Sequence, residues 1–183
     1  MKSILVVTLL LTVVSASAQP VYMSKSGTIS FFAGTAVEDI DATNEKALSF
    51  FNTETGEVVI SIPNKEFHFR RSLMEEHFNE NYMETEKYPK SEFKGKINNI
   101  KSINFTEAGP FQASVTGQLS IHGLSKERTL DVAIRKDGTR LIAETKFKVL
   151  LEDHKIDRPK ILWEKIAESV EVNANLVYEP YKK

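Results

Sequence analysis

The sequence contains no cysteine, and this absence restricts both the fold and the chemistry. Without disulfides, a stable domain has to rest on its hydrophobic core. Without thiolates, the chain has no cysteine nucleophile and no sulfur ligand for a metal. At 183 residues the chain is long enough for one such domain, because a chain of this size buries ~70% of its unfolded surface.

Neither sign of charge is in excess. The chain has 24 basic and 25 acidic residues, and its formal net charge is -1. A nucleic-acid-binding protein would show a basic face toward the phosphates, and docking on an anionic membrane surface would need an excess of cations. The balance of charge therefore argues against both kinds of partner.

Short catalytic and metal-binding motifs are also missing. The sequence has no G-x-S-x-G, no H-E-x-x-H and no glycine-rich phosphate loop. Its four histidines lack close ligand spacing such as H-x-x-x-H. We therefore expect no catalytic residue, no metal and no cofactor.

The longest apolar run lies at the N-terminus. Lys2 precedes an apolar stretch over residues 4–14, and Ala-Ser-Ala follows at residues 16–18. This run is too short to cross a bilayer core of ~30 Å, which takes about 20 residues. A positive start, an apolar centre and a small-residue cleavage site are typical of a secretory signal peptide. We therefore predict a signal peptide over residues 1–18 and a single domain over residues 19–183.

Most of the remaining sequence alternates between apolar and polar residues. In residues 111–121 the odd positions are Phe, Ala, Val, Gly, Leu and Ile, and the even positions are polar. A period of two is typical of a half-buried strand. The same pattern recurs at 130–135, 139–151 and 170–178, and shorter β-prone runs lie at 28–33, 46–52, 57–62, 67–69 and 93–103.

About eight or nine strands joined by short turns predict an antiparallel sandwich or a closed barrel. The run over residues 139–151 favours the barrel, because at ~3.3 Å per residue it would extend ~43 Å. Such a strand, tilted in an eight-stranded barrel, leaves an interior for side chains or for one elongated apolar ligand.

Residues 69–95 break the alternation. Side chains recur there at three- and four-residue steps, a helical period, at Leu73, Met74, His77, Phe78 and Met83. Tyr88-Pro89 ends the tract, because a residue before proline is pushed out of the helical region. We predict one short helix here and a second over residues 161–167, introduced by Pro159.

Four motifs follow one another along the chain. They are F-x-F, L-M-x-x-H-F and K-Y-P-K-x-x-F within residues 67–95; G-Q-L-S-I-H-G-L-S-K at 117–126; F-K-V with D-H-K-I within 147–156; and E-S-V-E-V at 168–172. Together they resemble the signature of the YceI-like polyisoprenoid-binding family. The resemblance implies an all-β, antiparallel, lipocalin-like β-barrel of about eight strands with one or two short helices. It also implies a periplasmic or secreted protein that holds an isoprenoid lipid or a quinone-like ligand, and it supplies no catalytic residue.

Inward-facing apolar side chains are the candidates for the ligand cavity. A polyprenyl tail offers only apolar surface, so its site needs a long apolar slot with a few polar groups at the mouth. We expect some candidates to line this slot and others to fill the core. They are Phe67, Phe69, Phe93, Phe111, Val115, Leu119, Leu130, Val132, Phe147, Val149, Val170 and Val172.

Two other functions stay open at this point: an enzyme acting on a small amphiphile in the same cavity, and a secreted barrel with a filled core that acts through protein contacts. The oligomeric state is open too, a homodimer included. We expect His122 and His154 to form structural hydrogen bonds to turn or loop backbone. We expect His68 to face outward. Trp163 should either plug one barrel end, the preferred interpretation, or lie at the mouth of the barrel.

Overall fold

The computed structural model describes residues 21–34, 38–157 and 167–181. Nine antiparallel strands form one sheet in the order β1-β9-β8-β7-β6-β5-β3-β2-β4. The strands are β1 Val21–Gly34, β2 Asp39–Asn52, β3 Glu57–Pro63, β4 His68–Phe69, β5 Lys90–Ile97, β6 Phe111–Ile121, β7 Leu124–Asp137, β8 Arg140–Leu150 and β9 Ser169–Pro180.

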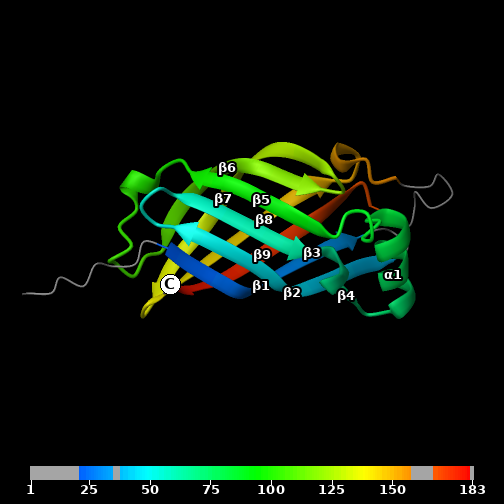
Figure 1. Cartoon of the computed structure of the whole chain (residues 1–183), viewed down its shortest axis with the longest axis horizontal. Coiled ribbons are helices and arrows are strands. Elements are labelled where there is room, and N and C mark those ends of the chain that lie inside the picture. The colour runs from blue at the N-terminus through cyan, green and yellow to red at the C-terminus, as the bar shows by residue number, and fades with distance from the viewer. Residues whose placement is uncertain (1–20, 35–37, 158–166, 182–183) are drawn as a thin grey trace, which may run out of the picture.

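The sheet closes on itself because β1 pairs with β2 as well as with β9. Leaving out β4, a two-residue addition beside β2, eight strands form the barrel. This arrangement confirms the predicted antiparallel, lipocalin-like barrel. Figure 1 shows it lengthwise, with helix α1 at one end and the connection between β5 and β6 at the other.

The alternating pattern explains how each long strand separates interior from surface. In β6, Ala113, Val115 and Leu119 are buried, whereas Gln112 and Gln118 face solvent. The bounds of β6 coincide with the predicted run of residues 111–121. Side chains that share this inward parity on neighbouring strands form one continuous hydrophobic core inside the barrel.

Tight turns connect the later strands. Ile121 pairs with Leu124, so His122 and Gly123 alone form the loop between β6 and β7. Both have positive φ, 51° at His122 and 75° at Gly123, as a two-residue turn of type I′ requires. Gly138, at φ 62°, turns the chain between β7 and β8 as its Asp-Gly sequence predicts.

The predicted first helix is present. Helix α1 spans Ser72–His77 and continues as a π-helical turn, η2, over Phe78–Tyr82. Three short 3₁₀ turns are η1 Asn64–Glu66, η3 Ile100–Ser102 and η4 Glu152–His154. Residues 161–166 of the second predicted helix, with Trp163, lie outside the described residues.

Several predicted strand limits are wrong. The run over 139–151 is shorter at both ends as β8, because Leu151 takes a helical conformation and begins η4. The run over 93–103 stops at Ile97, where the Asn98 side chain turns to donate to the Ser114 hydroxyl, 3.1 Å away.

Strands β1 and β2 are longer than the predicted runs 28–33 and 46–52. Irregularities in their pairing between Ser24 and Ile29 shift the inward parity. As a result, polar Ser24 and Ser49 are buried. The sequence of these two strands therefore does not show a regular alternation of apolar and polar residues.

Candidate functional site

A cavity of about 350 Å³ lies inside the barrel at the end that carries α1. Its size is within the range of ligand sites, roughly 300–1,000 Å³. Strands β1, β8 and β9 supply apolar wall, and α1 and η2 cover it with Met74, Phe78 and other side chains. We call this cavity the main chamber.

The structure divides the twelve predicted cavity residues into three groups. Seven line the main chamber: Phe67, Phe69, Leu119, Phe147, Val149, Val170 and Val172. Four line a separate void of about 60 Å³, farther along the barrel: Phe93, Val115, Leu130 and Val132. Phe111 lines neither and instead packs against Phe105, with ring centroids 6.1 Å apart.

Other wall residues were missed in the sequence. Ile29, Phe31 and Ala33 of β1 face the main chamber and do alternate, so their parity could have identified them. Met74 and Phe78 were recognised as one helical stripe, but their contact with the chamber depends on how the helix packs on the barrel.

Four aromatic rings hold the helical cover on the barrel. Phe31 of β1 lies 5.4 Å from Phe67, 5.8 Å from Phe69 and 5.8 Å from Phe78, measured between ring centroids. Pairs at such distances contribute about 0.5–1.5 kcal/mol each beyond their burial. The cover is therefore attached mainly by apolar contacts.

The buried polar atoms of Asn64 and Ser91 in the chamber wall are already bonded. Asn64, with 0% of its surface exposed, donates from Nδ2 to the Tyr88 carbonyl at 2.7 Å. Its Oδ1 accepts from the Ser91 hydroxyl at 2.8 Å, and its backbone N–H donates to the Pro89 carbonyl at 2.9 Å. These bonds fix the Tyr88-Pro89 corner and leave the wall apolar in character.

Charged side chains surround the same end of the barrel. Arg71, just before α1, pairs with Glu38, and Arg70 Nε lies 3.1 Å from Asp41 Oδ1. Burial raises the pKa of Tyr82 above its ordinary value, so this phenol stays neutral at physiological pH. The end covered by α1 thus combines an apolar interior with a charged, solvated rim.

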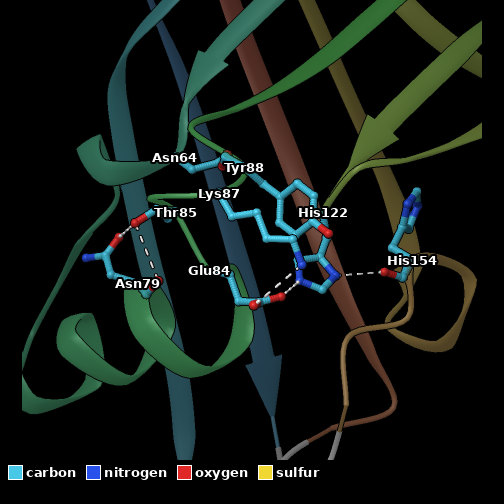
Figure 2. Close-up of polar contacts among 8 residues, drawn as sticks. All are labelled: Asn64, Asn79, Glu84, Thr85, Lys87, Tyr88, His122 and His154. Atoms are coloured by element: carbon cyan, nitrogen blue, oxygen red, sulfur yellow. Dashed lines mark hydrogen bonds and ion pairs between the residues drawn. The ribbon is translucent and has the colours of Figure 1, made fainter.

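His122 joins three segments near this end (Figure 2). Its Nε2 lies 2.8 Å from Glu84 Oε2, after η2, and its Nδ1 lies 3.1 Å from the His154 carbonyl oxygen. The Tyr88 ring packs against its imidazole, with centroids 4.5 Å apart. Both neighbouring oxygens are hydrogen-bond acceptors, so the ring contacts a polar group on each of its two nitrogens.

The structure gives His122 one more contact than the sequence predicted. The predicted backbone bond of His122 is confirmed, and the ring also reaches Glu84, which ties the cover to the barrel. His68 is exposed as predicted. Among the residues that the structure describes, no three metal-ligating side chains gather into one group.

We expect His154 to make the stability of the protein depend on pH. The side chain is fully buried, and its Nδ1 lies 3.2 Å from the Leu124 carbonyl, to which it donates as a neutral ring. Desolvation holds the pKa of His154 below its ordinary value of 6.5. As the pH falls below 6.5, the unfolded chain therefore binds a proton at His154 that the folded chain does not bind. The free energy of unfolding decreases as a result.

We expect the free energy of unfolding to drop by up to ~1.4 kcal/mol per pH unit in this window, as measured by urea denaturation. His154→Gln should reduce this slope, whatever its effect on stability at neutral pH. His68→Gln, on the surface, should keep the wild-type slope. Equal slopes in His154→Gln and wild type would show that His154 is not the responsible group.

A closed antiparallel barrel around an apolar, ligand-sized chamber defines a lipocalin-like class of protein. Within this class, the chain belongs to the YceI-like family, whose domain model matches residues 12–178. No curated protein gives a significant match to the sequence.

Solved structures share the fold at low sequence identity. A polyisoprenoid binding domain from Saccharophagus degradans, implicated in plant cell wall breakdown, superposes with a TM-score of 0.76 at 13% identity, covering 89% of this chain and 99% of that one. Burkholderia cenocepacia BcnA gives a TM-score of 0.69 at 16% identity, covering 82% and 95%. A Campylobacter jejuni YCEI protein gives 0.52 at 16% identity over the full length of both chains.

In the described part of the chain, no helix has the length and apolar character needed to cross a membrane.

Proposed function

We propose that this protein is a non-enzymatic binding protein that holds a polyisoprenoid, or a similar long-chain amphiphile such as a quinone, in the main chamber. The observation that carries the proposal is the apolar cavity of about 350 Å³ beneath a helical cover. Burying apolar tail surface there is worth about 25 cal/mol per Å². A mostly apolar wall selects such a tail over a polar molecule.

The contacts of the wall favour binding over catalysis. The Ser91 hydroxyl donates to Asn64, and not to a histidine that could activate it as a nucleophile. The side-chain amide of Asn64 in turn donates a hydrogen bond to the Tyr88 carbonyl. These groups hold the wall together and are not arranged to attack a substrate.

The charged rim suits the polar end of an amphiphile. Arg70 and Arg71 lie beside the helical cover with most of their side-chain surface exposed, 79% and 60%. A headgroup placed among them stays hydrated while the tail enters the chamber. Either an isoprenoid alcohol or a quinone ring meets this requirement, and the family likeness to a polyisoprenoid binding domain supports the former.

Native mass spectrometry of the purified protein tests the proposal. We expect a complex heavier than the polypeptide by the mass of one lipid, which is released when the protein is denatured. A protein that carries no lipid and binds no added farnesol would instead support a filled-core barrel acting through protein contacts. Chemical conversion of the bound amphiphile would support the enzyme alternative.

We propose further that residues 1–18 direct export and are removed, so that the mature chain begins at Gln19 in the periplasm or outside the cell. The apolar stretch before the Ala-Ser-Ala site supports this. The intact mass of protein from the exported fraction should correspond to residues 19–183, with or without cyclisation of the terminal glutamine. A mass that retains residues 1–18 would contradict cleavage.

A further inference from the structure

The interior of the barrel is divided into two spaces that share no lining residue. Phe147 and Val149 of β8 line the main chamber, as does Leu151 just after the strand, and Leu141, Ala143 and Thr145 of β8 line the smaller void. Along β9, Val170 and Val172 line the main chamber, and Ala174 begins the wall of the void. The division therefore runs across neighbouring strands at one height in the barrel.

Phe93 stands at this division. On β5, Ser91 faces the main chamber and Phe93, two residues further, faces the void. Phe93 pairs directly with Leu119 of β6, which lines the main chamber, and with Ile60 of β3, which lines the void. With 5% of its surface exposed, Phe93 is buried on the side of the void next to the residues that line the main chamber.

Gly95 makes room for the Phe93 ring. Gly95 follows Phe93 on the inward face of β5 and pairs with Gly117 of β6. A Cβ at Gly95 would come within 2.7 Å of the Phe93 ring. The ring therefore lies over a part of the wall that carries no side chain.

Beyond the void, the barrel is closed. Phe105, from the connection between β5 and β6, packs on Phe51 at 5.5 Å and on Phe111 at 6.1 Å between ring centroids. The Tyr178 hydroxyl lies 2.6 Å from the Ser49 hydroxyl in the same buried region. A ligand tail that passed Phe93 would thus enter a short dead end and could not leave the barrel.

We propose that Phe93 is the floor of the ligand site and sets the maximum length of tail that the protein accepts. This inference rests on the proposed function. On β8, Phe147 and Val149 line the main chamber over ~7 Å of strand, and Leu141 to Thr145 line the void over another ~13 Å. Removal of the floor therefore lets a tail extend into the part of the barrel that the void occupies.

The test uses prenyl alcohols of increasing length as probes: geraniol, farnesol, geranylgeraniol and solanesol. In the delipidated wild type, affinity should rise along the series until the tail reaches Phe93, and further units should add nothing. In Phe93→Ala, the first alcohol beyond that limit should bind about tenfold more tightly than in wild type, because burial of only two more methylene groups is worth about that factor.

Phe51→Ala is the matched control. It removes the same ring from the closed side of the void and leaves the floor in place, so its length limit should equal that of wild type. If Phe93→Ala does not fold, Phe93→Leu serves in its place, because leucine keeps the position apolar but leaves Gly95 uncovered and should shift the limit in the same direction.

The outcomes separate the two proposals. If wild type neither retains a lipid nor binds any prenyl alcohol, the proposed function is wrong. If wild type binds the alcohols but a folded Phe93→Ala or Phe93→Leu keeps the same length limit, the floor is not Phe93. A shift in Phe51→Ala as large as in Phe93→Ala would also overturn the inference, because any enlargement of the core would then suffice.

Discussion

Replacement of Val149 by aspartate is expected to abolish lipid retention and to destabilise the barrel by several kcal/mol. Val149 has 2% of its surface exposed, lines the main chamber and lies opposite Val170 on β9. A carboxylate at this position is removed from water and faces apolar side chains and the ligand tail, and desolvation of an unpaired charge costs several kcal/mol. Lipid per folded protein and urea denaturation measure the two effects.

Leu150→Asp is the control for this prediction. Leu150 is the next residue of β8, points outward with 40% of its surface exposed, and lies opposite Ser169. The same change from an apolar side chain to a carboxylate should alter stability by no more than about 0.5 kcal/mol there and leave the lipid bound. A folded Val149→Asp with as much lipid as wild type would remove β8 from the binding wall.

Asn64→Leu is expected to lower the free energy of unfolding by about 2–4 kcal/mol. The leucine is of similar size, but it leaves the Tyr88 carbonyl and the Ser91 hydroxyl without their partner, and each unsatisfied buried group costs about 1–3 kcal/mol. The corner at Tyr88-Pro89 lies between the helical cover and β5, so we also expect faster release of bound lipid. Urea denaturation and the dissociation rate of a fluorescent fatty acid measure these effects.

Asn175→Leu provides the comparison on the outer face of β9. Its side chain is exposed, and its Nδ2 donates to Glu144 at 3.3 Å, a contact that water can replace. The stability of this variant should stay close to that of wild type. If Asn64→Leu were equally neutral, the buried hydrogen bonds of Asn64 would not be what fastens the corner.

The fold could be predicted because the later strands are half-buried. Strands β6, β8 and β9 place apolar and polar residues on opposite faces, so the inward parity of Val149 or Leu119 is visible in the sequence. Parity gives the face on which a side chain lies, but not its height in the barrel. Phe93 and Leu119 are directly paired neighbours with the same inward parity, yet they line different spaces, and the alternation in the sequence does not distinguish them.

Two features of the site could not be predicted from local pattern. The first is the path of β1 and β2, where a bulge brings polar Ser24 and Ser49 inside and where a Cβ at Gly27 would meet Leu176 at 2.2 Å. The second is the helical cover. Its period was visible, but the contact of Phe78 with Phe31 joins segments that are distant in sequence.

The first and last strands of the barrel are hydrogen-bonded to each other, and this pairing sets the order of events in folding. Residues of β1 such as Phe31 meet their partners in β9, such as Val172, only after nearly the whole chain has been synthesised. Closing such long-range pairs is slow compared with forming local structure. Until then the unpaired edges of β1 and β8 are free to join other chains, so a protein truncated before β9 is expected to aggregate.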